Sequence, residues 1–238
     1  MREGVIGVID SGVGGLNVLK QMVKSVKGET FAYLGDNENV PYGNKSDREL
    51  LSLALSSVMK LSEHRIKCII LACNTLSTTV RDRLENITGI PVFGVFPPFE
   101  TACLYGRKCL LIATGRTCEK FKETENVKIL PCPTLAGDIE RNKFSMNKVS
   151  LTDLNGKGLS NVNTVIFGCT HYEFLKIEIL DHFNAERAVS GIGGTVDSVK
   201  KWLKKQYNYE KSGENTVFFV GSSAAENKKF WEEVVLRN

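Results

Sequence analysis

Short apolar runs alternate with helical patterns along the 238-residue chain. In the first half, four runs of the kind found in buried strands are separated by stretches such as residues 16–26 and 48–60, whose apolar residues recur at helical spacing. Strands that alternate with helices usually pair in parallel, with the helices covering the sheet. The pattern therefore predicts an α/β fold, with first-half strands at residues 5–9, 31–34, 68–72 and 92–95.

The same alternation restarts after Pro97-Pro98, the best candidate for a hinge between two halves. A last strand, residues 216–220, is expected to return to the first sheet. We predict two similar domains, each a mostly parallel sheet flanked by helices, with the active site in the cleft between them. The first domain would comprise residues 1–96 and 209–238, and the second residues 97–208. Second-half strands are expected at residues 109–113, 127–130, 165–167 and 188–189, with helices near Thr101, Cys118, Tyr172 and Thr195.

Composition narrows the class of protein. A hydrophobic content of 42% is ordinary for a globular protein, and the net charge of +4 comes from scattered lysines. The basic cluster at residues 200–205 is typical of the solvated face of a helix, and no aromatic-basic motif accompanies it. No apolar run is long enough to span a bilayer. We therefore expect neither nucleic acid nor a membrane as a partner.

The seven cysteines include no pair with Cys-x-x-Cys spacing, and the three histidines form no cluster with the spacing of metal ligands. The strand expected at residues 5–9 leaves no room for a signal peptide. We expect a cytoplasmic protein with free thiols, and neither a metal nor another cofactor.

Two cysteines stand out by their positions. Cys73 and Cys169 each fall at the carboxyl end of an expected strand, where open α/β sheets place their ligands. The segments around them, residues 70–75 and 166–171, align with each other and suggest an internal duplication. Each cysteine could be an ordinary core residue, but polar residues follow both where a core would continue apolar. Two opposed thiols suit a reaction in which one removes a proton from carbon and the other returns a proton to the opposite face.

The glycine-rich segment Asp10-Ser11-Gly12-Val13-Gly14-Gly15 follows the first strand. It lacks the Gly-Lys-Ser/Thr of a Walker loop, and Asn17 replaces the third glycine of the dinucleotide fingerprint. Two interpretations remain equally supported: the loop binds a carboxylate, or it is a simple turn capped by Asp10. His171 is placed to tune the thiol of Cys169 or to carry a proton. Pro41-Tyr42-Gly43 and Glu140 carry little signal by themselves.

Taken together, these segments resemble the glutamate racemase family of cofactor-independent amino-acid racemases. They occur in family order and at family-like spacing over most of the chain. The match comprises residues 10–16, Gly35-Asp36, Pro41-Tyr42-Gly43, Ala72-Cys73-Asn74-Thr75, Ala113-Thr114 with Thr117, and residues 168–172.

The resemblance implies an enzyme that interconverts L- and D-glutamate and supplies D-glutamate for peptidoglycan. It implies that Cys73 and Cys169 are the catalytic acid/bases, supported by Asp10 beside Cys73 and by His171 and Glu140 beside Cys169. It allows a homodimer, although no surface pattern selects one. The positions that match substrate-contacting residues of the family are Ser11, Pro41, Tyr42, Gly43, Asn74, Thr75, Thr114, Thr117 and Thr170.

The sequence also departs from the family pattern. Residues 37–40 replace the usual Thr-Ala and basic or aromatic residue, residues 97–99 replace a small-residue segment, Glu173 replaces a proline, and Ser190 stands where an aspartate commonly follows the strand. These departures keep two alternatives open: a racemase for aspartate or another amino acid, and a catalytically weak paralogue that binds an amino acid.

Overall fold

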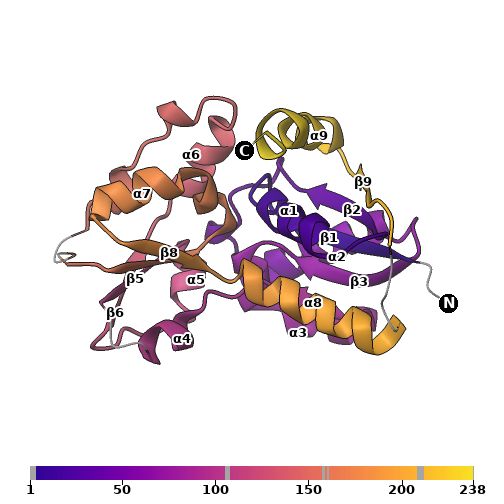
Figure 1. The fold of residues 1–238 in the computed structure, drawn as a ribbon, viewed down its shortest axis with the longest axis horizontal. Helices are drawn as coiled ribbons and strands as arrows, with labels where there is room; N and C mark the ends of the chain where they lie inside the picture. Colours follow the sequence, from indigo (N-terminus) through magenta and orange to yellow (C-terminus); the bar gives the residue numbers. More distant parts are fainter. Residues whose placement is uncertain (1–3, 105–107, 157–158, 160, 208–211, 238) are drawn as a thin grey trace.

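Two parallel sheets form the framework of the protein (Figure 1). The computed structural model describes residues 4–104, 108–156, 159, 161–207 and 212–237. The first sheet has the strand order β4-β3-β1-β2-β9 and the second β6-β5-β7-β8. The first comprises β1 (Val5–Asp10), β2 (Thr30–Gly35), β3 (Ile66–Leu71), β4 (Val92–Gly94) and β9 (Thr216–Phe219). The second comprises β5 (Cys109–Ala113), β6 (Val127–Pro131), β7 (Thr164–Gly168) and β8 (Arg187–Ser190).

The two sheets repeat one topology. The order β4-β3-β1-β2 in the first corresponds to β8-β7-β5-β6 in the second, and every strand pair is parallel. β9 is added at the free edge of β2, as expected. The predicted fold class, two similar parallel-sheet α/β domains, is confirmed. The strands that precede the two singled-out cysteines, β3 and β7, occupy equivalent places in their sheets.

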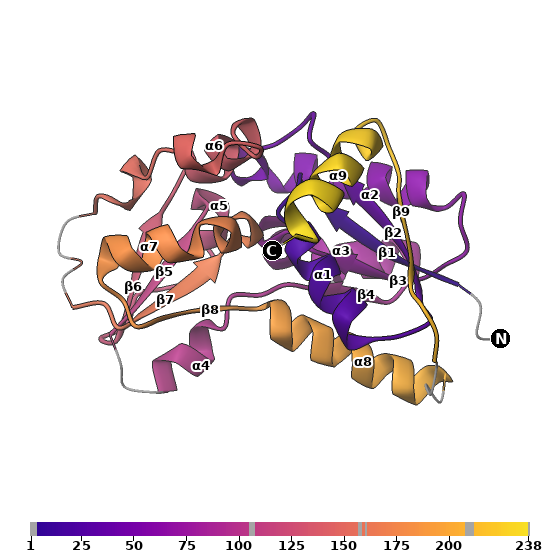
Figure 2. The ribbon, with the colours of Figure 1, turned by 45° about the horizontal axis from the view of Figure 1, so that its top comes forward.

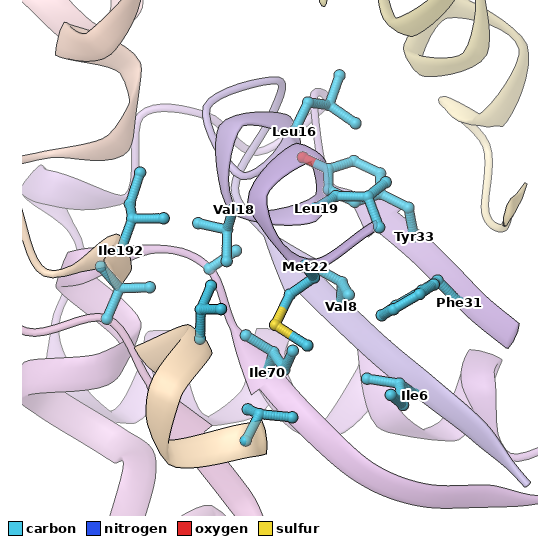
Figure 3. Packing of buried hydrophobic residues seen from close by; sticks show 14 of the residues in the cluster. Ile6, Val8, Leu16, Val18, Leu19, Met22, Phe31, Tyr33, Ile70 and Ile192 are labelled. Atoms are coloured by element: carbon cyan, nitrogen blue, oxygen red, sulfur yellow. The ribbon is translucent and has the colours of Figure 1, made fainter. Parts of the chain in front are cut away.

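Helices cover both faces of the first sheet. α1 (Leu16–Ser25) packs on one face, where Leu16, Leu19 and Met22 lie among Val8 and Phe31 (Figure 3). The other face is covered by α2 (Asp47–Leu61) and α3 (Asn74–Thr88). α2 begins with a reciprocal cap in which Ser46 accepts from the Glu49 N–H and the Glu49 carboxylate accepts from the Ser46 N–H.

α8 (Ile192–Tyr207) lies against the first domain, although the sequence analysis placed it in the second (Figure 2). Its apolar residues Ile192, Val196, Val199 and Leu203 recur every three or four positions and are buried in the same cluster as α1. The structure therefore differs from the expected division at residues 208 and 209. We propose a first domain of residues 4–96 and 192–237 and a second of residues 97–191.

The second domain has shorter helices, and some of its secondary structure was not expected from the sequence. Its helices are α4 (Phe99–Leu104), α5 (Gly115–Cys118), α6 (Leu135–Arg141) and α7 (Lys176–Phe183). A 3₁₀ segment, Thr170–Leu175, precedes α7, so the α-helix expected near Tyr172 starts later. At the end of the chain, α9 (Ala224–Phe230) and a π-helical turn (Trp231–Val235) pack on the first domain.

The chain crosses between the domains twice, and the two crossings touch. A Cβ added to Gly191 would overlap the backbone of Phe96, so these segments approach as closely as a glycine allows. The Thr195 hydroxyl donates to the carbonyl of Gly94 (3.0 Å) beside them. No helix in the described part of the chain combines the length and apolarity needed to cross a membrane.

The placement of α8 can be tested by unfolding. Leu203→Ala deletes a side chain that is fully buried in the first-domain cluster. We expect this change to lower the free energy of unfolding by about 2–5 kcal/mol, as buried leucine truncations do. The matched control, Lys204→Ala, alters the exposed face of the same helix and should stay within about 0.5 kcal/mol of the wild type. Urea denaturation followed by circular dichroism measures both, and equal effects would contradict the placement.

Candidate active site

Cys73 and Cys169 line one cavity from opposite domains. Cys73 stands between β3 and α3, and Cys169 stands between β7 and the 3₁₀ segment that follows it. Both are free thiols, 6% and 8% exposed respectively. The empty space between the domains here is about 300 Å³. Two equivalent strand ends therefore bring two thiols to one narrow cavity.

Most of the residues singled out from the sequence meet at this cavity. Cys73, Cys169 and His171 line it, and so do all the expected substrate-contacting residues except Thr117. Asp10, Glu140 and Thr117 lie behind the lining, each joined by hydrogen bonds to the segments that form it. The sequence analysis missed two lining residues, Val40 and Ala136, whose apolar side chains carry no chemical signal.

A hydrogen-bonded chain runs from Cys169 away from the cavity. Nδ1 of His171 lies 3.6 Å from Sγ of Cys169, and Nε2 lies 2.6 Å from Oε1 of Glu140. Burial opposes a charge on His171, but Cys169 and Glu140 outweigh it and hold the imidazole pKa well above its usual value. At neutral pH His171 is therefore an imidazolium. A cation at this position stabilises negative charge on the sulfur of Cys169.

Cys73 has the opposite environment. Burial raises the pKa of its thiol to about 12, and the Asp10 carboxylate contributes to this increase. Hydrogen bonds from the Leu76 N–H and the Ser11 hydroxyl lower the pKa but do not offset the increase. Asp10 is itself buried, which raises its pKa, and its Oδ2 accepts from the N–H groups of Gly12 (3.0 Å) and Gly15 (2.9 Å). Cys73 is therefore protonated at neutral pH, and the group beside it is a carboxylate, whereas the group beside Cys169 is an imidazole.

The glycine-rich loop between β1 and α1 serves the protein's own side chains. The Asp10 carboxylate accepts hydrogen bonds from backbone N–H groups of the loop. The Val13 N–H donates to Oε1 of Glu140, which belongs to the other domain (2.5 Å). A Cβ on Gly12 would overlap the Glu140 carboxylate, and one on Gly14 would overlap the His171 ring. Both carboxylates held by this loop thus belong to the chain, and its glycines leave room for the second domain.

Hydroxyl groups of both domains meet on another side of the cavity. Oγ1 of Thr75 lies 3.0 Å from Oγ1 of Thr114 and 3.3 Å from Oγ1 of Thr117. A Cβ on Gly43 would overlap Thr114, so this loop also fits closely against the second domain. The Tyr42 hydroxyl donates to Asp36 (2.7 Å), and burial raises its pKa further above the usual range. The Asn74 amide donates to the carbonyl of Val95 (3.1 Å).

Other parts of the described structure offer weaker sites. No group of three or more histidine, cysteine or carboxylate side chains within it could hold a metal ion. A more spacious groove of about 1860 Å³ lies between α1, α7 and α8, but it is open to solvent, and none of the expected catalytic or substrate-contacting residues lines it. The chemistry therefore concentrates at the two thiols.

Lys143 is a further buried polar residue that the sequence analysis missed. It is 8% exposed and lies 3.3 Å from Oε2 of Glu140 through its Nζ. Its position three residues after Glu140 was a usable signal, because residues at this spacing are neighbours on a helix surface.

Comparisons with known proteins extend these observations. No protein-family model matches the chain. The chain is 35% identical over 222 residues to the glutamate racemase of Clostridium acetobutylicum, covering 86% of each protein. It is 37% identical over 204 residues to that of Leptospira borgpetersenii, covering 80% of this chain and 79% of the relative.

Solved structures agree over nearly the whole length. Glutamate racemase isoform RacE1 of Bacillus anthracis superposes with a TM-score of 0.77 at 25% identity, covering 99% of this chain and 95% of that one. The Thermus thermophilus glutamate racemase, solved in complex with beta-chloro-D-alanine, gives a TM-score of 0.73 at 29% identity, covering 98% and 94%. The family resemblance drawn from the motifs is confirmed: the chain belongs to the glutamate racemase family.

Proposed function

We propose that this protein interconverts L- and D-glutamate by proton transfer between two thiols, without a cofactor. One observation carries the proposal: two buried cysteines enter a single cavity from opposite domains, with different electrostatic surroundings. Inversion at carbon requires an acceptor and a donor on opposite faces of the same atom. A cavity flanked by two thiols supplies both.

The different neighbours of the two thiols suggest the first step. The Cys169 thiolate, stabilised by the His171 imidazolium, removes the α-proton from one enantiomer, and the C–H electron pair remains on the α-carbon. The Cys73 thiol then donates its proton to the opposite face. The cycle ends with a Cys169 thiol and a Cys73 thiolate, the arrangement needed for the other enantiomer, and proton exchange with water restores the start. No electron or oxygen atom is gained or lost.

The difficult part is the charge that develops on a carbon beside a carboxylate. Preorganised donors can stabilise such charge in a water-poor site. The lining residues Ser11, Asn74, Thr75 and Thr170 bring hydroxyl and amide groups from both domains, and all four are almost fully buried. We propose that these groups hold the substrate carboxylate while the thiols exchange protons.

Closure of the domains is part of this mechanism. Glu140 reaches across to the Val13 N–H, and the space for it exists only because residue 12 is glycine. Closure expels water, which strengthens the electrostatic contacts inside the cavity. The same close fit implies that the domains must part to admit a substrate.

Family membership supports glutamate as the substrate. We propose that the D-glutamate formed is used for peptidoglycan and that the enzyme works in the cytoplasm. The beta-chloro-D-alanine bound by the Thermus thermophilus relative is an amino-acid analogue, which supports an amino acid as the ligand here. A homodimer remains compatible with this proposal. The decisive assay is α-proton exchange in heavy water, followed by NMR, over a panel of amino acids. Faster exchange with aspartate than with glutamate would favour the alternative of an aspartate racemase. A lack of exchange with every amino acid tested would favour the catalytically weak paralogue.

Replacing either thiol tests the two-base assignment. Cys73→Ser and Cys169→Ser keep nearly the same size but exchange a thiol for a hydroxyl, a far poorer base near neutral pH. We expect each to lower turnover by about 10²–10⁴-fold, the range that a positioned acid or base contributes. Cys118→Ser, a half-buried cysteine outside the cavity, is the control and should retain activity. Normal circular dichroism together with appreciable turnover in either cavity variant would refute the assignment.

Domain closure is tested at the glycine loop. Gly12→Ala adds one methyl group where the Glu140 carboxylate lies, so we expect the domains to stay apart and turnover to fall by at least about 10²-fold. Gly193→Ala adds the same group near the start of α8, where the described structure leaves space for it, and should be neutral. Racemisation rates of the two variants make the comparison. An active Gly12→Ala enzyme would show that this contact is not needed.

Cofactor independence is tested by removal. The purified protein, dialysed against a chelator and passed over a desalting column, should keep its full rate, because the proposed steps use only side chains of the chain. A visible absorbance that tracks activity, or recovery of a lost rate by added metal, would contradict this prediction.

A further inference from the structure

Lys143 is a buried lysine in the turn that follows α6, with carboxylates on two sides. Its Nζ donates to the backbone carbonyl of Glu140 (3.2 Å), to Oε2 of Glu140 (3.3 Å) and to Oε1 of Glu226 (3.0 Å). An ammonium group has three protons to donate, and these three acceptors match them. Burying a lysine is costly unless it is paired, so this arrangement needs both carboxylates in place.

The two carboxylates belong to different domains. Glu140 lies on α6 of the second domain, whereas Glu226 lies on α9, which packs on the first. Oε2 of Glu226 accepts from the Asn37 side chain (2.8 Å), in the loop that follows β2, and the neighbouring Asn227 donates to the carbonyl of Gly35 (3.2 Å). One carboxylate oxygen of Glu226 thus binds the first domain, and the other binds Lys143.

A continuous line of polar contacts therefore runs from the first domain to the thiol of Cys169. It passes through Asn37, Glu226, Lys143, Glu140 and His171 and crosses the domain boundary between Glu226 and Lys143. Asn37 belongs to the stretch, residues 37–40, that departs from the usual family pattern. The line thus begins at a residue that departs from the usual family pattern.

We propose that Lys143 is a positioning residue that couples domain closure to the orientation of the Glu140–His171 pair beside Cys169. In the closed state Lys143 binds both carboxylates and holds Oε2 of Glu140, while Oε1 faces His171 and Val13. When the domains part, Lys143 loses Glu226, and Glu140 loses the Val13 N–H. This inference rests on the proposed racemase function, and Lys143 itself touches neither thiol.

The charges around Glu140 determine what its loss would do. His171 and Lys143 are the cationic neighbours, and Asp10, Tyr33 and Glu226 are the acidic groups that interact with it. Burial alone would raise the Glu140 pKa, but His171, the Val13 N–H and Lys143 hold it below its usual value. Removing Lys143 should therefore let Glu140 take up a proton at a higher pH. Activity that needs the ionised carboxylate would then fall away earlier as the pH is lowered.

The experiment compares four variants of the full chain. Lys143→Met removes the charge, Lys143→Arg keeps it, Glu226→Gln removes the partner in the first domain, and Glu232→Gln is the control. Glu232 is on the same C-terminal segment and faces only the exposed Lys228 (3.9 Å) among the described residues. For each variant, kcat and KM for glutamate are measured from pH 5 to pH 10.

For Lys143→Met we expect kcat to fall about 10- to 100-fold, the loss typical when a group that orients a functional histidine is removed. We also expect the acidic limb of the kcat–pH profile to move to higher pH. Lys143→Arg should return the limb to its wild-type position. Glu226→Gln should mainly raise KM, because closure is weakened, without an upward move of the limb. Glu232→Gln should match the wild type.

Three results would overturn the inference while leaving the racemase function intact: an unmoved limb in Lys143→Met, no recovery in Lys143→Arg, or an unchanged KM in Glu226→Gln. A merely structural lysine would lower the yield of folded protein without shifting the pH profile. Absence of wild-type exchange with glutamate would instead overturn the proposed function, and this inference with it.

Discussion

The contact of the Glu140 carboxylate with both domains is the constraint on which the site depends. Glu140 and His171 are both buried, and such groups are stable only when they are paired. The partner on the other side is the Val13 N–H, reached through a loop with no side chain at residue 12. The identity of the loop residues, the pKa of the imidazole and the closed arrangement of the domains are therefore consequences of one requirement.

Duplication of a sheet supplies two equivalent positions, and the surroundings make them unequal. β3 and β7 bring Cys73 and Cys169 to the same kind of strand end. Beside Cys73 the first domain places a carboxylate, Asp10, and beside Cys169 the second places an imidazole. Two cysteines at equivalent strand ends thus have different electrostatic surroundings because their neighbours differ.

Local sequence patterns predicted the strands well, and they also predicted that Cys73 and Cys169 lie at strand ends. The central strands β1, β2, β3, β5 and β7 are buried along most of their length, so their apolar runs are clear in the sequence. Each of the two cysteines follows the end of such a run and is itself followed by polar residues. Packing between distant segments was less accessible. α8 follows the second sheet in the sequence, yet its apolar face is buried under the first, and periodicity alone does not say which sheet a helix covers.

The same limit applied to the site. Glu140 was reached only through the family resemblance, because a glutamate on a short helix is ordinarily solvated. Lys143 was missed although it follows three residues later, since its second partner, Glu226, is far along the chain. Val40 and Ala136 have no chemical mark that distinguishes them from other apolar residues. Contacts across the domain boundary were therefore the part that the sequence analysis did not capture.

The touching crossings at Phe96 and Gly191 also bear on how the chain is made. Between them lies an unbroken segment that contains all four strands of the second sheet, so that sheet can form as soon as it leaves the ribosome. The first domain cannot be completed then. The side of α1 that packs against α8 stays uncovered, and the outer edge of β2 stays unpaired, until α8 and β9 emerge. The earlier half of the protein is thus the last to finish folding.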